Sequence, residues 1–270
     1  TKHVPPGSWY RSYMDIRLVS PPLTDAGPND AFGPAKRPPA TKTDRAYWSL
    51  RRAIVVGDLP EDSALDDGEL MSRYDMGRTP IREAIKRLAL EEMVIWPPHR
   101  TPHVRTTSPS DLAQLYEARH IFELPAARIA AERATIAQLD ELTAYCDLFD
   151  SAVGGEAMYE AAEHDYDFHL GVAKASHNRF LVDAVGHLNC GSLRLWYHSY
   201  IKLGTDRINA DHRRILDALL QHDPKAATEV SRDHIQFSHE RQLALYGLGS
   251  LDRQARTVTG SRPTRPVTRR

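Results

Sequence analysis

The chain has 270 residues, with 35 lysines and arginines against 36 aspartates and glutamates, and 41% of its residues are hydrophobic. This length allows one or two packed domains with a sizeable core, and the composition excludes a wholly disordered chain. The formal net charge of −1 argues, taken alone, against a nucleic-acid partner. A net charge averages over surfaces that face different partners, however, so it has to be examined segment by segment.

The number of cysteines and the distribution of apolar residues indicate the cellular compartment of the protein. Cys146 and Cys190 are too few for a disulfide framework, and neither belongs to a CxxC motif. No run of about 18 apolar residues predicts a membrane span, and residues 1–25 show no apolar segment of a signal peptide. We therefore expect a reduced, cytoplasmic protein without a membrane partner.

Charge and proline content divide the chain into four segments. Residues 1–40 hold eight of the 18 prolines and predict a disordered extension, while residues 251–270, with six arginines and one aspartate, predict a basic disordered tail. Residues 41–105 carry 11 basic and 11 acidic residues. Residues 106–250 carry 13 basic and 21 acidic residues and ten of the 13 histidines. We therefore expect two differently built domains that meet near residues 105–108.

The first of these domains, residues 41–105, has the pattern of three helices and a hairpin. Apolar residues recur at helical spacing over residues 44–56 and again over residues 68–75. Pro80 lies in the first turn of a third helix, where its missing N–H is harmless. Two short apolar runs, residues 94–96 and 103–105, flank a proline-rich loop as the strands of a β-hairpin or wing would.

The exposed face of the third helix is basic. Arginine near the N-terminal end of a helix in the DNA major groove can bond to guanine in bidentate fashion, and a threonine hydroxyl and lysines can reach phosphates. A solvated helix face with partners such as Glu83 is the alternative that the charges alone leave open. The basic residues at helical spacing are Arg78, Arg82, Lys86 and Arg87.

The exact string favours DNA binding. Residues 65–94, with the core Arg-Thr-Pro-Ile-Arg-Glu-Ala at 78–84, closely resemble the winged helix-turn-helix signature of GntR-family regulators. The resemblance implies that this helix faces double-stranded DNA and that Arg100 lies at the wing tip. The resemblance marks Arg78, Thr79, Arg82 and Arg100 as DNA-binding, and the basic face of the helix adds Lys86 and Arg87 to the predicted set.

This sequence departs from the family pattern at a few positions. Gly77 replaces the usual Ser or Thr before Arg78, which removes a helix N-cap and a phosphate donor. His99 and Thr101 stand where wing glycines are usual, which changes minor-groove contact. The DNA half-site that the protein prefers is therefore the property that can least be inferred from the family resemblance.

The second domain, residues 106–250, is predicted to be an antiparallel all-α bundle, which makes the whole protein mainly α. It has no alternating runs of β-branched residues, and its loops are short. Thr135, Asn178 and Thr205 are predicted helix caps. The six predicted helices span about residues 109–133, 136–152, 156–176, 178–202, 205–222 and 224–246.

Four polar residues fall within the apolar stripes of three of these helices. Asp165 and His169 are i,i+4 neighbours on one face, and His212 and His234 are in phase with the apolar residues of their own helices. An ionised aspartate and three imidazoles turned toward one core are costly unless paired or metal-bound. Individually satisfied core histidines are one explanation. A divalent transition metal is the other, with zinc favoured and nickel, manganese or iron as alternatives.

This region also has a family resemblance. The string Asp-Tyr-Asp-Phe-His at 165–169, the string His-Arg-Arg-Ile-Leu-Asp-Ala at 212–218 and His234 look like the metal-binding FCD effector domain of FadR-like GntR regulators, with a length typical of the VanR-like branch. The resemblance implies that Asp165, His169, His212 and His234 bind the metal below a cavity. A small organic acid would then reach the metal and Arg119, with Asn178 and Arg194 as further effector-binding candidates.

Together these patterns predict a homodimeric transcriptional repressor that binds an inverted-repeat operator, and so lies on the nucleoid, and is controlled by a small carboxylate effector beside the metal. A metalloenzyme that uses the Asp/His set to activate water is the rival from another class. It is disfavoured because the sequence has no HExxH, nucleophile, P-loop or GxGxxG motif. A regulator whose metal is purely structural is a third possibility. We expect no catalytic residues.

Overall fold

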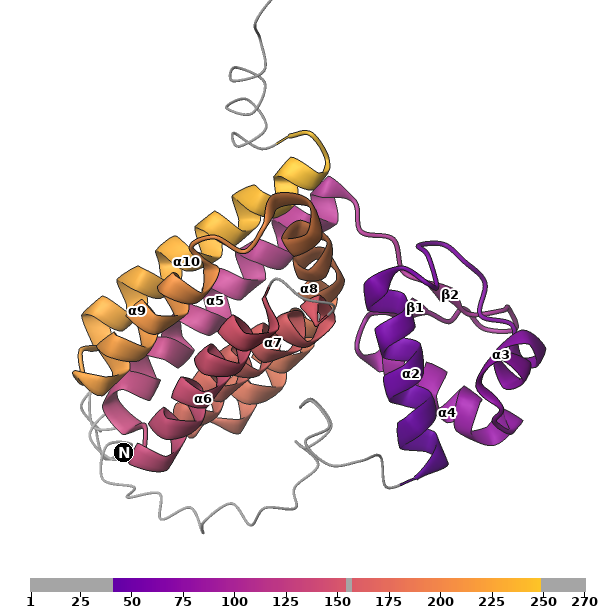
Figure 1. Ribbon diagram of the computed structural model, residues 1–270, viewed down its shortest axis with the longest axis horizontal. Helices are drawn as coiled ribbons and strands as arrows, with labels where there is room; N and C mark the ends of the chain where they lie inside the picture. Colours follow the sequence, from indigo (N-terminus) through magenta and orange to yellow (C-terminus); the bar gives the residue numbers. More distant parts are fainter. Residues whose placement is uncertain (1–40, 154–156, 249–270) are drawn as a thin grey trace, which may run out of the picture. The chain divides into compact units, whose positions relative to one another are not determined.

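The computed structural model describes residues 41–153 and 157–248 (Figure 1), all of which belong to one compact unit, Gly33–Arg270. The predicted tails, residues 1–40 and 251–270, lie outside the described residues. Within the described ranges the chain forms nine helices and one two-stranded sheet. The mainly α class predicted from the sequence is confirmed.

The first part of the described chain has the helix order of a winged helix-turn-helix. Its strands pair in antiparallel fashion, Val94 with Val104 and Ile95 with His103, and so form the predicted hairpin. The elements in chain order are α2 (Lys42–Val56), α3 (Asp67–Tyr74), α4 (Arg78–Leu90), β1 (Val94–Ile95) and β2 (His103–Val104).

Local signals explain where these helices begin and end. The Thr41 side chain accepts a hydrogen bond from the Asp44 backbone N–H in a capping box that starts α2. Gly57, with φ of 92°, ends that helix in the left-handed conformation that glycine adopts without strain. Gly77 starts α4 without a side-chain cap, as expected from the missing Ser or Thr.

The core of this part forms between α2 and α4. One stripe of α4, including Ile81, Ile85 and Leu88, is fully buried, as are Leu50 and Ile54 of α2. Burying each such side chain contributes about 1.5–3 kcal/mol relative to leaving it in water. Because this stripe is packed, the opposite face of α4 is left for solvent or a partner.

The second part is a bundle of six helices (Figure 1). They match the six predicted stretches to within a few residues at their ends. In chain order they are α5 (Pro109–Arg133), α6 (Ile136–Ala152), α7 (Met158–Ala175), α8 (Arg179–Leu203), α9 (Ile208–Leu220) and α10 (Pro224–Leu245).

Two of the three predicted caps are confirmed and one is wrong. The side chains of Thr135 and Asn178 accept backbone hydrogen bonds at the starts of α6 and α8. Thr205 caps nothing, because α9 begins later, at Ile208, after Arg207 in a left-handed conformation with φ of 72°. Ser108 and Asp223 cap α5 and α10, which the sequence analysis did not predict.

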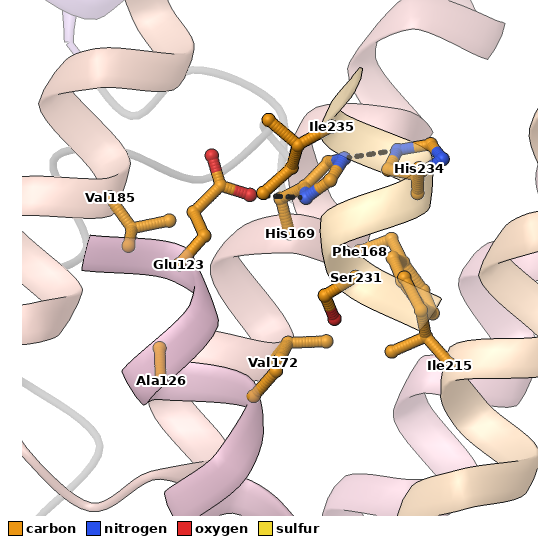
Figure 2. A pocket seen from close by; sticks show the side chains of 11 residues that line it. Glu123, Ala126, Phe168, His169, Val172, Val185, Ile215, Ser231, His234 and Ile235 are labelled. Atoms are coloured by element: carbon orange, nitrogen blue, oxygen red, sulfur yellow. Dashed lines mark hydrogen bonds and ion pairs between the residues drawn. The ribbon is translucent and has the colours of Figure 1, made fainter. Parts of the chain in front are cut away.

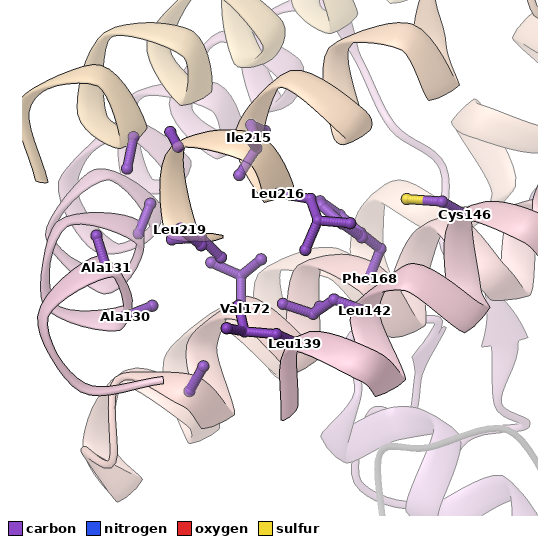
Figure 3. Packing of buried hydrophobic residues seen from close by; sticks show 14 of the residues in the cluster. Ala130, Ala131, Leu139, Leu142, Cys146, Phe168, Val172, Ile215, Leu216 and Leu219 are labelled. Carbon is purple, nitrogen blue, oxygen red and sulfur yellow. The ribbon is translucent and has the colours of Figure 1, made fainter. Parts of the chain in front are cut away.

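A hydrophobic core lies between α5, α6, α7 and α9 at one end of the bundle (Figure 3). On α5 it contains only alanines, which let the neighbouring helices approach closely. The larger side chains come from the other three helices: Leu139, Leu142, Phe168, Val172, Ile215, Leu216 and Leu219. This packing fixes α7 and α9 relative to each other within one turn of the predicted metal ligands.

Candidate metal centre and DNA-binding surface

The structure brings the four predicted metal ligands together. Asp165 and His169 come from α7, His212 from α9 and His234 from α10. Each offers one ligand atom, and these atoms all lie within 4.8 Å of one another. The four side chains are 1–6% exposed. A polar cluster buried this deeply in an apolar bundle needs a compensating partner.

The geometry of the cluster fits a cation with nitrogen and oxygen ligands. Nε2 of His212 lies 2.8 Å from Oδ1 of Asp165, and Nε2 of His169 lies 3.2 Å from Nε2 of His234. Ligand atoms of a tetrahedral zinc lie about 3.3 Å apart, given Zn–N distances of about 2.0–2.1 Å. Although Asp165 Oδ1 and His212 Nε2 are close, the two buried atoms make no hydrogen bond with each other or with any other described residue. A metal would satisfy both atoms at once.

A second layer of polar groups orients the ligands. Nδ1 of His169 contacts Oε2 of Glu123 at 2.8 Å (Figure 2), and Arg119 donates to the same carboxylate. The Tyr200 hydroxyl donates to Oδ2 of Asp165 at 2.6 Å. These contacts direct His169 Nε2 and Asp165 Oδ1 toward the shared centre, as carboxylate–histidine–metal arrangements do.

Asp211 lies farther from His234, too far for a hydrogen bond, and acts on it only as a nearby negative charge. Its Oδ2 lies 3.9 Å from Nδ1 of His234. The sequence analysis missed Glu123, Tyr200 and Asp211 as supporting residues. Two signals were present: Glu123 follows Arg119 by four residues on a buried face, and Asp211 directly precedes His212.

The electrostatics of the cluster favour the protonation states that bind metal. Burial alone would raise the pKa of Asp165, but the imidazoles of His212, His169 and His234 lower it further than burial raises it. Burial lowers the pKa of His212, and it lowers the pKa of His234 to about 4. At neutral pH the aspartate is therefore ionised and these two imidazoles are neutral, as metal coordination requires.

Two small cavities border the cluster, one apolar and one polar. The first (Figure 2) is lined mainly by alanine, valine, isoleucine and phenylalanine side chains, together with Glu123, His169, Ser231 and His234. The second, which also borders His234, is lined by Asp165, Ser199, Tyr200, Ile208, His234, Phe237, Ser238 and Arg241. A ligand of the metal can therefore meet both kinds of surface.

The three predicted effector-binding residues lie in different settings. Arg119 is fully buried, and its NH1 has no hydrogen-bond partner among the described residues. Asn178 caps α8 through its Oδ1, which accepts from Phe180. Arg194 donates to the Thr107 hydroxyl at 3.2 Å. None of the three lines a cavity beside the cluster. Of the three, Arg119 is the one that contacts a cavity-lining residue, Glu123.

Most of the predicted DNA-binding residues share an exposed surface. Arg82 donates to Asp67 at 2.9 Å, and its guanidinium lies 5.0 Å from the Trp96 ring centre. Arg78 lies 3.7 Å from the same Asp67 carboxylate. Asp67 of α3 thus lies beside both arginines, and Trp96 beside Arg82. The residues whose side chains are exposed are Arg78, Thr79, Arg82, Lys86 and Arg100.

Arg87 differs from this set. Its guanidinium lies 3.6 Å from the centre of the Tyr47 ring and 3.3 Å from the Glu91 carboxylate. Tyr47 and Glu91 are both buried. The helical spacing predicted that Arg87 shares the basic face. Because a helix turns by about 100° per residue, Arg87 instead faces α2, although its neighbour Lys86 is exposed. Its contacts are those of a residue that supports the fold.

Comparison with known proteins assigns both parts. Residues 42–101 match the bacterial regulatory proteins of the gntR family, and residues 114–237 match the FCD domain. The chain belongs to the GntR family. It combines the family's DNA-binding domain with an FCD effector domain, whose buried Asp/His cluster can hold a metal.

Curated relatives of this GntR chain are transcriptional regulators. It is 26% identical over 231 residues to the Uxu operon transcriptional regulator of Escherichia coli (strain K12), covering 76% of this chain and 89% of the relative. It is 30% identical over 144 residues to the Glc operon transcriptional activator of the same strain, covering 50% of this chain. The match spans only 56% of that relative's length.

Solved structures share the fold. E. coli McbR/YncC matches with a TM-score of 0.64 and 19% identity, over 77% of this chain and 99% of that one. A putative GntR transcriptional regulator from Rhodococcus sp. RHA1 matches with a TM-score of 0.63 and 19% identity, over 76% and 99%. The two matched domains and the curated relatives are those of DNA-binding transcriptional regulators. None of the described helices is long and apolar enough to cross a membrane.

Proposed function

We propose that this GntR protein is a cytoplasmic repressor whose operator binding is controlled by a small organic acid bound beside a divalent metal. Residues 41–105 would bind an inverted-repeat operator, and residues 106–250 would bind metal and effector and form the homodimer. The observation that carries the proposal is the buried convergence of Asp165 and three histidines next to two cavities. The chemistry of that site is selective enough to sense a small molecule.

Zinc is the metal that the site suits best. Three imidazoles and one carboxylate are borderline ligands that bind zinc, nickel, manganese or iron in preference to calcium. When bound, the metal supplies a Lewis-acidic centre for an anionic ligand. The chain's own part is to hold Asp165 Oδ1 and His169 Nε2 in place through Tyr200 and Glu123, with the Asp211 carboxylate as a negative charge near His234.

An organic acid is the ligand class that the surroundings favour. A carboxylate binds a metal and a guanidinium through the same two oxygens, and the buried Arg119 offers an N–H without a partner among the described residues. An effector that binds better to one arrangement of the protein shifts the population toward that arrangement. Release from the operator follows if the preferred arrangement binds DNA less well.

The proposed dimer has a matching surface on α5. Ile121 is 59% exposed and Phe122 is 37% exposed, although both belong to the helix that carries Arg119. Pro125 extends the exposed apolar strip by one turn. Such a strip on a regulator that reads a two-fold operator fits a second copy of the chain, since a C2 interface uses the same patch on both subunits.

Operator release tests this function directly. The operator would first be selected from a random duplex pool with the zinc-loaded protein, and the affinity would be measured at fixed salt. Candidate acids would then be titrated into zinc-loaded and zinc-stripped protein. Zinc-dependent loss of operator affinity with one acid supports the proposal. A metal that only raises the melting temperature, with no acid changing operator affinity, would instead assign it a structural role.

A further inference from the structure

Three arginines are deeply buried in the described chain, and two of them have a carboxylate partner. Arg119 pairs with Glu123 at 2.6 Å, and Arg51 pairs with Glu163. Arg241 of α10 is 5% exposed, and no described carboxylate makes an ion pair with it. An uncompensated cation in a protein interior is costly, so Arg241 requires an explanation.

The contacts of Arg241 position it without neutralising it. Its NH2 donates to the backbone carbonyls of Ser199, at 3.2 Å, and of Gly204, at the C-terminal end of α8. A helix C-terminus attracts a cation, but its partial charge is about half a unit. Burial lowers the pKa of Arg241, and the attraction of Tyr200 and Asp206 does not offset that effect. Its Nε is buried with no hydrogen-bond partner among the described residues.

Arg241 also lines the polar cavity beside the metal ligands. That cavity is shared with Asp165 and His234, together with the hydroxyl-bearing Ser199, Tyr200 and Ser238. The unpaired cation and the metal cluster therefore border one space. The space measures about 10 Å³, so a ligand larger than water would have to widen it, and would then meet hydroxyl groups, a guanidinium and the metal.

The charges around this space call for a dianion. A divalent metal beside Asp165 leaves one positive charge, and the Arg119–Glu123 pair adds none. Asp211 is already paired with Arg207 and Arg214. Arg241 therefore brings the uncompensated charge to about +2.

We propose that Arg241 recognises a second carboxylate of the effector, so that the ligand class is a small dicarboxylate with one carboxylate at the metal and the other at Arg241. This inference rests on the proposed function, which requires an organic acid at the metal, and makes that ligand specific. Arg119, whose charge Glu123 already neutralises, then has a secondary role.

Matched pairs of acids test the assignment. Calorimetry with the zinc-loaded full chain would compare malonate with propionate, succinate with butyrate and glutarate with pentanoate, each pair having equal carbon number. Wild-type protein should bind at least one dicarboxylate about 10- to 100-fold more tightly than its partner, as a charged hydrogen bond in a buried site provides. Arg241→Gln should remove that preference, while Arg232→Gln, on the exposed side of the same helix, should keep it. Arg241→Lys, which keeps the charge, should keep part of it.

The outcomes separate the two levels of inference. Zinc-dependent binding of monocarboxylates and dicarboxylates with equal affinity overturns the role of Arg241 and leaves the proposed function standing. No binding of any acid, or binding that ignores zinc, overturns both. Tighter binding of inorganic phosphate than of every dicarboxylate overturns the dicarboxylate class. Arg241→Gln loses the carbonyl contacts at the end of α8 and could fail to fold. The affinity ratio of dicarboxylate to monocarboxylate is measured on the wild-type protein, so it tests the dicarboxylate class without that variant.

Discussion

Glu123 holds His169 through a 2.8 Å contact between Oε2 and Nδ1. Because Arg119 donates to the same carboxylate, the pKa of Glu123 stays below its usual range despite its burial. An ionised Glu123 accepts a hydrogen bond from Nδ1–H, which leaves the lone pair of the imidazole on Nε2. The orientation of a metal ligand on α7 is thus set by a residue of α5.

Replacing Glu123 should therefore weaken metal binding without removing a ligand. Glu123→Gln keeps the size of the side chain but loses the negative charge that Nδ1 and Arg119 require. Supporting residues of this kind change metal affinity by about 10- to 100-fold. Competition between the protein and a chromophoric zinc chelator measures the change.

Glu117→Gln is the matched control, since Glu117 is exposed on the same helix. It should bind zinc as the wild type does. Equal zinc affinity of the two variants would mean that the contact between Glu123 and His169 has no part in ligation.

The metal-free protein should lose stability as the pH falls from 6.5 toward 4. The pKa of His234 is lowered from 6.5 to about 4, chiefly by burial, so in this window the unfolded chain binds a proton that the folded chain does not. Stability therefore rises with pH there and falls on acidification. The difference for His234 alone is about 3 kcal/mol. Urea unfolding at a series of pH values, after zinc removal, measures it.

Substitutions at His234 and His177 separate this effect from general acid unfolding. His234→Gln should flatten the dependence between pH 6.5 and 4, while His177→Gln, at an exposed position, should leave it intact. Asp165, whose folded pKa is lowered, contributes stability that is lost only below its ordinary pKa of 3.8. An identical slope in all three proteins would exclude His234 as the source.

The sequence predicts the ligands well because helical periodicity encodes which residues share a buried face. Asp165 and His169 are four residues apart in an apolar stripe, and each other histidine is in phase with its own helix. Periodicity does not encode which residues from different helices touch. Tyr200 and Asp165 are 35 residues apart, and their hydrogen bond depends on how α7 and α8 pack. Arg87 shows the same limit. Successive helical residues point about 100° apart, and this rotation places Arg87 against the ring of Tyr47 and not in solvent.

Asn178 and Arg194 illustrate a different limit. Both were chosen by resemblance as polar residues near the predicted cavity, but local chemistry uses them elsewhere. Asn178 accepts from a backbone N–H two residues on, which asparagine does at helix starts. Arg194 binds Thr107, in the segment that precedes α5. Arg241, by contrast, lies seven residues after His234 and so on the same face of α10, but only the structure reveals that it makes no ion pair with a described carboxylate.

On DNA, Arg82 and Lys86 should behave differently, although both are exposed on α4. Arg82 is held by Asp67 and Trp96, which suits a bidentate contact with a base. Arg82→Ala should cost about 1–3 kcal/mol on the selected operator and relax its sequence preference. Lys86→Ala should weaken binding to all duplexes and reduce the salt slope by about one. Fluorescence anisotropy at several salt concentrations distinguishes the two.

Arg128→Ala, an exposed substitution on α5, is the control for nonspecific loss of positive charge. It should leave operator affinity and salt slope unchanged. If Arg82→Ala weakened cognate and random duplexes equally, Arg82 would contact phosphate and not a base.

Two neighbouring leucines test the core that fixes α9. Leu219, labelled in Figure 3, is 0% exposed, whereas Leu220 is 51% exposed. Leu219→Ala leaves a cavity between α9 and its neighbours and should lower the free energy of unfolding by about 2–5 kcal/mol. Leu220→Ala should change it by less than about 0.5 kcal/mol.

Because His212 lies two turns before Leu219 on the same helix, Leu219→Ala should also weaken zinc binding, while Leu220→Ala should not. Equal destabilisation by both substitutions would contradict the packing of α9 described for this core.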